Sequence, residues 1–254
     1  MSGFSPRVAV GFFRRTWRRV LRRPVHLTFS LVQPLMWMAF FGFLFQRFPI
    51  SEGLDYRTFL VPGLCAMTVL FGASQSGIDW IRDDQSRMLE RMLAMPSPAT
   101  HLLFGKLAAD TSRFLLQALA VFALGLAVGA GPFRPSAFGL LNGGLALGLF
   151  GFAFAGVSST VALWTRNQQS MATFVHLINM PMLFTSTALV PEREMPGWLV
   201  EISVWNPLSL TVNALRPSLL AARGFDFLAL GVLAALAVVA FLTALGALER
   251  IRAS

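Results

Sequence analysis

The sequence predicts an all-α membrane protein with six transmembrane helices, for two reasons. The first is that six runs of at least 18 residues contain no Lys, Arg, Asp or Glu: residues 26–45, 59–78, 114–131, 137–163, 171–190 and 227–248. A hydrocarbon core about 30 Å thick needs about 20 helical residues, and a helix satisfies its own backbone polar groups in lipid. The second is composition: 55% of residues are hydrophobic and 13% are charged. Little material remains for a soluble domain, so residues 1–254 are expected to form one membrane domain.

The basic residues indicate how the six predicted helices are oriented. If the amino terminus is cytoplasmic, 15 of the 21 Lys and Arg residues lie in inner segments, whereas the 12 Asp and Glu residues divide evenly between the two sides. Segments on the cytoplasmic side carry an excess of basic residues. We therefore expect a multi-pass protein of the plasma (cytoplasmic) membrane with both termini in the cytoplasm. The net charge of +9 then indicates contact with anionic membrane lipids, and no nucleic acid is expected as a partner.

Residues 8–23 have the pattern of an amphipathic helix that lies in the membrane interface. Phe13, Trp17, Val20 and Leu21 recur at intervals of three and four, and arginines occupy the opposite face. Such a helix places its aromatic side in the acyl boundary and its arginines on lipid head groups, and Pro24 ends it. The predicted lipid-interface residues are Arg14, Arg15, Trp17, Arg18, Arg19 and Arg22. A signal peptide is the alternative, but the apolar run that follows is too long and no small-residue cleavage site follows it.

Between the second and third runs, residues 87–95 predict a short amphipathic helix on the inner side. Met88, Leu89, Met92 and Leu93 form an apolar stripe at helical spacing, and prolines follow at positions 96 and 98. The segment is too short and too charged to span a membrane. From the residues alone, two interpretations remain open: the stripe docks into a groove on a partner protein, or the helix lies on the bilayer.

Several polar side chains within the uncharged runs are candidates for the lining of a substrate pathway, because intramembrane polar groups usually face a bundle interior or a cavity. These candidates are Gln33, Ser74, Gln75, His176, Asn179 and Thr185. His176 and Asn179 are three residues apart, so they are expected on one helix face. Hydrogen bonds to a neighbouring helix, or a position near the inner water boundary for Ser74 and Gln75, would explain the same residues without a pathway.

The sequence lacks the motifs of several catalytic classes. No Gly-x4-Gly-Lys-Ser/Thr is present, and Phe104-Gly105-Lys106 is expected to turn the chain and anchor it at the inner head groups. The three histidines do not cluster with cysteine or carboxylates, so no metal site is predicted. Cys65 has no nearby base, and no catalytic residue is predicted. No Asp or Glu lies within a run, which argues against a secondary transporter with a carboxylate relay.

Three motifs resemble the permeases of the ABC-2 family of ABC transporters. They are Glu90-Arg91-Met-Leu-Ala-Met-Pro96 after the charged end of the second run, Leu103-Phe-Gly105-Lys106 before the third, and Asn206-Pro207-Leu208 after the fifth. They are most similar to the daunorubicin/doxorubicin-resistance type, a group that overlaps lipooligosaccharide and polysaccharide exporters. The resemblance covers nearly the whole chain.

The resemblance implies roles for two segments. Residues 87–95 would be the coupling helix, inserted into a separate ATPase subunit, and residues 191–226 would form short extracellular re-entrant helices before the last span. The implied ATPase-coupling residues are Arg87, Met88, Leu89, Glu90, Arg91, Met92, Leu93 and Pro96.

The resemblance also implies a function, namely the membrane subunit of an ATP-driven exporter. ATP and Mg would bind to two copies of a partner ATPase, and this chain would have no cofactor of its own. A second copy of this chain, or a related permease, would complete the path for an amphiphilic drug-like compound or a lipid or glycan. The alternatives are an ion-coupled secondary transporter, for which related internal halves would be expected, and a membrane-embedded assembly factor without transport.

Overall fold

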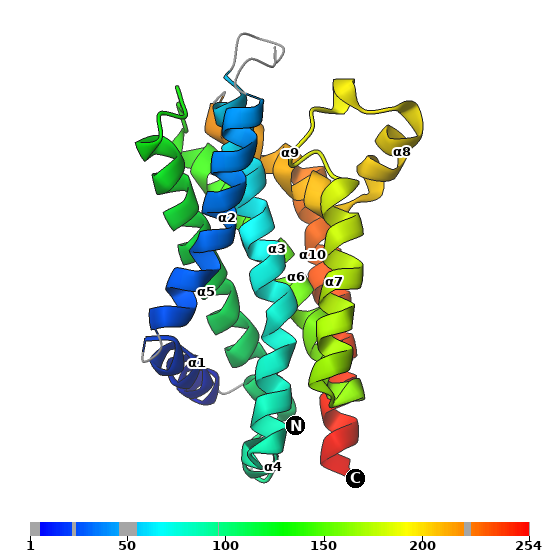
Figure 1. Ribbon diagram of the computed structural model, residues 1–254. Helices are drawn as coiled ribbons and strands as arrows, with labels where there is room; N and C mark the ends of the chain where they lie inside the picture. Colours follow the sequence, from blue (N-terminus) through cyan, green and yellow to red (C-terminus); the bar gives the residue numbers. More distant parts are fainter. Residues whose placement is uncertain (1–5, 22–23, 46–54, 96, 221–224, 254) are drawn as a thin grey trace.

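The computed structural model describes residues 6–21, 24–45, 55–95, 97–220 and 225–253, and all regular secondary structure within these ranges is helical (Figure 1). The α-helices are α1 (Pro6–Leu21), α2 (Pro24–Leu44), α3 (Tyr56–Gln85), α4 (Met88–Leu93), α5 (Ala99–Ala127), α6 (Ala137–Thr165), α7 (Gln168–Phe184), α8 (Gly197–Trp205), α9 (Pro207–Leu220) and α10 (Phe227–Ala253). A 3-10 turn, η2, covers Glu192–Glu194.

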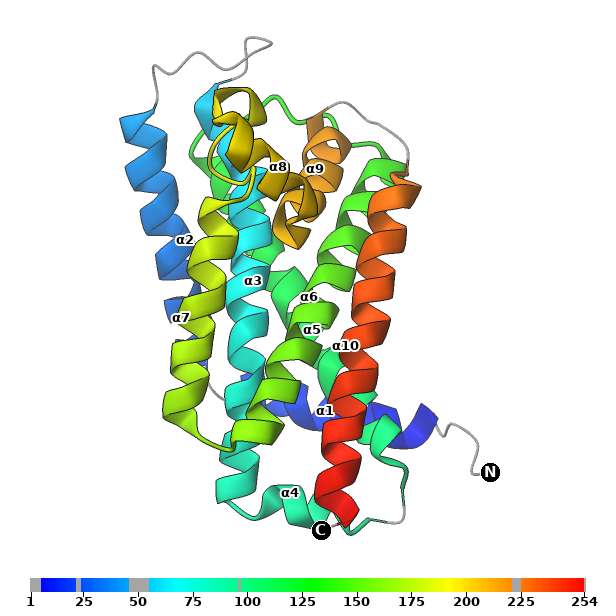
Figure 2. The ribbon, with the colours of Figure 1, turned by 90° about the vertical axis from the view of Figure 1, so that its right-hand side faces the viewer.

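The long helices form one bundle whose two ends differ. Helices α2, α3, α5, α6, α7 and α10 run alongside one another, α1 lies across one end, and α8 and α9 cover the other (Figures 1 and 2). Helix α4 and the carboxyl terminus lie at the same end as α1, which we call the basal end. Four of the described helices, α3, α5, α6 and α10, are long and apolar enough to cross a membrane. Helix α2 has a shorter described apolar stretch, Val32–Leu44, and α7 has 17 residues.

Helix α3 is the centre of the bundle, because most of its length is buried. It packs against α2, α5, α6, α7 and α9, and Leu60, Leu64 and Leu70 have no exposed surface. Gly63 lies directly against the backbone of Ala188, which a larger residue would prevent. Small residues permit this close approach of backbones in helical membrane proteins.

The Asn206-Pro207-Leu208 motif joins two helices at the end opposite α1. The Asn206 amide nitrogen donates to the Met182 carbonyl (2.7 Å) and to the Thr185 hydroxyl (2.9 Å). The side-chain carbonyl oxygen of Asn206 accepts a hydrogen bond from the backbone amide of Leu208 (2.9 Å). The side chain thereby satisfies backbone groups at the end of α7 and the start of α9 that have no partner within their own helices.

The charged connection between the second and third predicted helices is shorter than expected. Helix α3 continues to Gln85, and α5 already begins at Ala99, well before the predicted start at residue 114. The prediction that Gly105 and Lys106 turn the chain is therefore wrong, because both lie inside α5. Lys106 remains helical because it pairs with Asp110, one turn further along the same helix.

Helix α7 ends earlier than the fifth predicted run. Its C-cap is Thr185, whose amide and hydroxyl both bond back to the Pro181 carbonyl (2.9 and 2.8 Å). The chain then leaves the helix before residue 190, the predicted end. Two short helices, α8 and α9, separate α7 from α10, as expected for the segment before the last long helix.

Candidate functional site

Helix α4 is a six-residue helix at the basal end, between α3 and α5. It follows Arg87, whose left-handed backbone (φ 54°) turns the chain out of α3, a conformation that is uncommon for residues other than glycine. Leu89 and Met92 are 1% and 3% exposed and pack into the core of the same chain. Glu90 and Arg91 are exposed.

This orientation divides the predicted apolar stripe into two parts. Leu89 and Met92 attach α4 to its own subunit, so they do not lie on the exposed face of the helix. Met88 and Leu93 are half-buried. The face that remains accessible to a partner is formed by Arg87, Glu90 and Arg91, and it is therefore charged. Pro96, also predicted as a coupling residue, lies outside the described residues.

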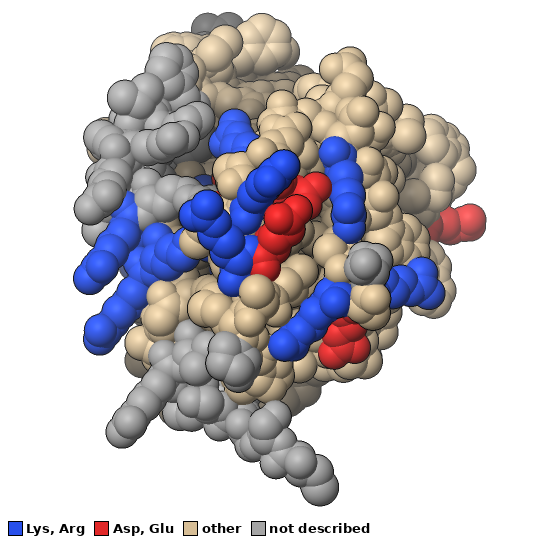
Figure 3. Space-filling view, turned by 90° about the horizontal axis from the view of Figure 1, so that it is seen from below, with Lys and Arg blue, Asp and Glu red and all other residues tan. Residues whose placement is uncertain are grey.

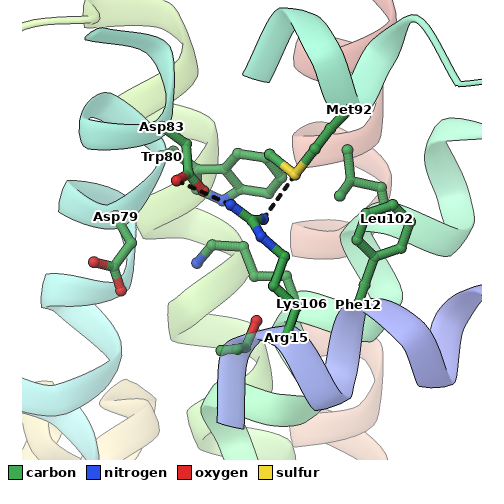
Figure 4. Close-up of a pocket in the computed structure, with 9 residues that line it drawn as sticks. Phe12, Arg15, Asp79, Trp80, Asp83, Met92, Leu102 and Lys106 are labelled. Atoms are coloured by element: carbon green, nitrogen blue, oxygen red, sulfur yellow. Dashed lines mark hydrogen bonds and ion pairs between the residues drawn. The ribbon is translucent and has the colours of Figure 1, made fainter. Parts of the chain in front are cut away.

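Arg15 of α1 lies in a pocket between α1, α3, α4 and α5 and contacts two of these helices (Figure 4). Its guanidinium donates to the Met92 sulfur (Nη1 to Sδ, 2.8 Å) and to the Asp83 carboxylate (Nη2 to Oδ1, 3.3 Å). Asp83 is buried, and Arg15 is about one-third exposed. Phe12 and Leu102 line the same pocket. Arg15, predicted to bind lipid, therefore connects the amino-terminal helix to α3 and α4.

The other predicted lipid-interface residues have different environments. Trp17 is half-buried, and its indole nitrogen donates to the Ser112 hydroxyl of α5 (2.8 Å). Arg14 and Arg18 are exposed, as contact with head groups requires. The side chain of Arg19 and the whole of Arg22 lie outside the described residues. Helix α1 is thus amphipathic as predicted, but part of its polar and aromatic surface binds the protein itself.

A buried ionic cluster lies next to this pocket, and it was not predicted. The ammonium group of Lys106, the only lysine in the sequence, donates to the Asp110 carboxylate (2.8 Å) and to the Ser76 carbonyl and hydroxyl (3.2 and 3.1 Å). The Ser76 hydroxyl donates to the same Asp110 oxygen. Lys106 also lies 5.2 Å from the centre of the Trp80 ring, within the range of a cation–π interaction. Both charged side chains are buried.

The spacing of Lys106, Asp110 and Arg113 contained a signal for this cluster. Positions four and three residues apart lie on one face of a helix, and Arg113 lies 3.8 Å from Asp110. The prediction of a turn at Gly105 and Lys106 placed these charges outside a long helix, whereas all three residues belong to α5. Asp110 precedes the third uncharged run, but it lies inside α5, one of the helices that are long and apolar enough to cross a membrane.

The predicted pathway residues do not converge on one site within the subunit. The Ser74 hydroxyl of α3 donates to the Asn179 carbonyl oxygen of α7 (2.7 Å), and both residues are buried. The side-chain amide nitrogen of Asn179 (Nδ2) has no hydrogen-bond partner among the described residues. Thr185 is half-buried and binds Asn206.

The three remaining pathway candidates lie on the surface of the subunit. Gln33, Gln75 and His176 are exposed, on α2, α3 and α7 respectively. Helix α3 contacts both α2 and α7, so the three side chains come from neighbouring helices. His176 and Asn179 differ in environment although they are close in sequence, because Asn179 points toward α3 and His176 does not.

Metal-binding clusters are absent from the described part of the chain. It contains no group of three or more His, Cys, Asp or Glu side chains that could hold a metal ion. Cys65 is buried, and its thiol contacts the Ala118 carbonyl (3.4 Å).

Basic side chains gather at the basal end, as Figure 3 shows from below. Exposed arginines on α1, α3, α4 and α10 are Arg14, Arg18, Arg82, Arg91, Arg250 and Arg252. Acidic side chains are fewer on this face, and Asp83 and Asp110 are buried in ion pairs. A partner that binds here would meet a positively charged surface.

A helical bundle with several membrane-spanning candidates and a short helix presented at one end defines a multi-pass membrane protein. Residues 10–220 match the family described as ABC-2 type transporter. The chain therefore belongs to the ABC-2 type transporter family and is the permease (membrane) subunit of such a transporter, as the motifs predicted. The matched family is that of the membrane domain, which lacks the ATPase domain, and association with an ATPase subunit follows from the family.

Individual relatives agree with this assignment. The chain is 30% identical over 209 residues to the putative transport permease ycf38 of Cyanophora paradoxa, covering 80% of this chain and 71% of the relative. It is 26% identical over 216 residues to the daunorubicin resistance ABC transporter permease protein DrrB1 of Streptomyces coeruleorubidus, covering 82% and 75%. It is 26% identical over 202 residues to nodulation protein J of Sinorhizobium fredii, covering 78% and 76%.

Proposed function

We propose that this permease exports an amphiphilic drug-like substrate from the cytoplasm or the inner leaflet, in a complex with two copies of an ATPase subunit and a second permease. The observation that carries the proposal is α4, which is fixed to the subunit by Leu89 and Met92 and presents Arg87, Glu90 and Arg91 outward. A short helix held in this way would transmit force, because a push on its outer face would reach α3, against which α4 packs.

We further propose that α2 and α7 complete a set of six spans. At about 1.5 Å per residue, the 21 residues of α2 would measure about 31 Å and the 17 residues of α7 about 25 Å. Both lengths are close to a hydrocarbon core of about 30 Å. Both helices also run alongside the four longer spans in two perpendicular views (Figures 1 and 2).

The basal end would face the cytoplasm, and α8 and α9 would lie at the outer side. The support is the excess of exposed arginines at the basal end, because basic residues concentrate on the cytoplasmic side of a membrane. Both termini then lie in the cytoplasm. Arg14 and Arg18 of α1 would contact lipid head groups at that surface.

The outward face of α4 would dock into a groove on the ATPase. Because that face is charged, we propose that the groove presents carboxylates to Arg87 and Arg91, together with a basic group for Glu90. The half-buried Met88 and Leu93 would lie at the edge of the contact. ATP binding would close the two ATPases and displace α4 and the helices attached to it.

The substrate pathway would lie between two permease subunits, which are either two copies of this chain or this chain and a related one. Gln33, Gln75 and His176 support this arrangement, because they expose polar groups on neighbouring helices of a membrane protein. The free amide nitrogen of buried Asn179 offers a further polar contact. The relative that is named for daunorubicin resistance supports a drug-like substrate, and a lipid or glycan remains the alternative.

Membrane orientation is testable with single cysteines. We expect Glu90→Cys and Glu194→Cys, each in a Cys65→Ala background, to react with a membrane-impermeant maleimide from opposite sides of the membrane. Both positions are exposed, at the basal end and in η2 respectively. Reaction of both from the same side would contradict the six-span arrangement.

Docking of the charged face of α4 on the ATPase is testable by reversing one charge on that face. We expect Arg91→Glu to weaken binding of the partner ATPase about tenfold, which corresponds to about 1.4 kcal/mol, because a like charge would face the proposed carboxylates. ATP-dependent export of a fluorescent amphiphilic dye from inverted vesicles should fall with it. Binding is measured by co-purification from detergent.

The matched control for this experiment is Arg193→Glu. Arg193 is an exposed arginine in η2, at the opposite end of the subunit, so the same change in charge should affect neither measurement. If Arg91→Glu binds the ATPase as strongly as Arg193→Glu does, the charged face of α4 is not the docking surface.

A further inference from the structure

The last turn of α10 reaches the segment that follows the coupling helix α4. Arg252 donates from Nη1 to the Ser97 carbonyl (3.1 Å) and from Nη2 to the Met95 carbonyl (3.4 Å). These residues are separated by more than 150 positions in the sequence. One side chain therefore binds two backbone carbonyls on the carboxyl side of α4.

The backbone hydrogen bonds of the described residues in this segment are local. The prolines at positions 96 and 98 have no backbone N–H to donate, and Met95 and Ala94 are exposed. The Ser97 amide donates to the Met95 carbonyl (2.7 Å), the same carbonyl that accepts from Arg252. Carbonyls just beyond a helix lack partners in that helix, and a nearby arginine is well suited to bind them.

Helix α10 is itself firmly joined to the membrane bundle. It packs along α6, where Gly156 allows the backbone of Ala240 to approach closely. The Thr160 and Thr243 hydroxyls lie 3.3 Å apart across the same pair of helices. A displacement at the basal end of α10 is thus passed to α6.

We propose that Arg252 is a positioning residue that ties the carboxyl side of α4 to α10, so that movement of the coupling helix is delivered to the α6–α10 pair as well as to α3 and α5. This proposal rests on the proposed coupling role of α4. Arg15 of α1 contacts Met92, near the carboxyl end of α4, so arginines from two other helices, α1 and α10, hold this end of the coupling helix. Without Arg252, α4 would still dock on the ATPase, but its movement would no longer be fully transmitted to α10.

The matched control is Arg250, which lies in the same last turn of α10 and is also exposed. No hydrogen bond or ion pair joins it to the described part of the α4 segment. Arg250→Ala removes the same charge from the same helix without removing the tie. Arg252→Lys keeps the charge but has a single donor group in place of the guanidinium fork, so it should restore only part of the effect.

The first experiment measures hydrogen–deuterium exchange of the purified permease in nanodiscs. Arg252→Ala should speed exchange in the peptide that contains residues 94–98, roughly two- to fivefold, the size expected from losing an exposed charged contact. Arg250→Ala should exchange like the unchanged protein. Equal exchange in the two alanine variants would overturn the proposal.

The second experiment measures dye exported per ATP hydrolysed by the reconstituted complex. For Arg252→Ala we expect this ratio to fall about two- to fivefold relative to Arg250→Ala, with equal ATPase co-purification in the two variants, and Arg252→Lys should lie between Arg252→Ala and the unchanged protein. An unchanged ratio would overturn the proposal even if exchange had increased. The exchange experiment needs no ATPase, so failure of the unchanged permease to bind an ATPase or export dye would refute the proposed function separately.

Discussion

Replacing Asp110 with leucine is expected to destabilise the subunit by about 3–5 kcal/mol, the cost of removing one partner of a buried ion pair. The change leaves the ammonium group of Lys106 buried without its carboxylate, and the Ser76 hydroxyl loses its acceptor. The hydrogen bond that Lys106 donates to the Ser76 carbonyl does not compensate for leaving the Lys106 charge buried and unpaired. The measurement is the midpoint of thermal aggregation in detergent micelles.

The control for this prediction is the double variant Lys106→Met with Asp110→Leu. Buried ion pairs are often replaced by apolar residues of similar size with little loss of stability. The double variant should therefore recover most of the midpoint that Asp110→Leu loses. Equal stability of Asp110→Leu and the unchanged protein would show that Asp110 is not part of a buried ion pair.

The second large effect is expected at the crossing of α3 with the segment that follows α7. A Cβ atom at Gly63 would overlap the Ala188 carbonyl oxygen and lie 2.8 Å from the carbonyl carbon. Backbone atoms on both sides leave little room to adjust, so Gly63→Ala should destabilise the subunit by about 1–3 kcal/mol, as overpacking does in a well-packed core. The same thermal assay measures it.

Gly144→Ala in α6 is the matched control for Gly63→Ala. A Cβ atom at Gly144 meets nothing within 4 Å, and alanine is favoured over glycine within a helix by about 0.5–1 kcal/mol. This variant should be as stable as the unchanged protein or slightly more so. If Gly63→Ala matches it, the close contact between α3 and Ala188 is not required.

The difference between sequence and structure is clearest in the stretch from Asp79 to Arg113. Its charges resemble those of a loop, because an isolated charge is expensive inside a membrane helix. Lys106 and Asp110 avoid that cost by pairing across one helix turn, so α5 extends through them. The spacing of these residues was visible in the sequence, but their burial against Ser76 and Trp80 depends on α3, which no local pattern specifies.

Helix α4 shows a second limit of the same kind. Its helical spacing is a local property, and the sequence located it correctly. Which side of it faces outward depends on what lies next to it. Arg15 and Asp83 come from α1 and α3, and they fix Met92 toward the subunit. A four-residue apolar stripe cannot reveal that two of its members already have partners.

By itself, the sequence determined that this chain is an all-α membrane protein and, through its motifs, a permease of the ABC-2 type. Both follow from features carried by contiguous residues: uncharged runs long enough for lipid, an arginine-rich amphipathic helix and short motifs at fixed positions. Only the tertiary structure decided where Arg15, Lys106 and Arg252 form their contacts. The physical reason is that these charged side chains are stabilised by partners that helix packing places beside them. Those partners lie up to 157 residues away along the chain.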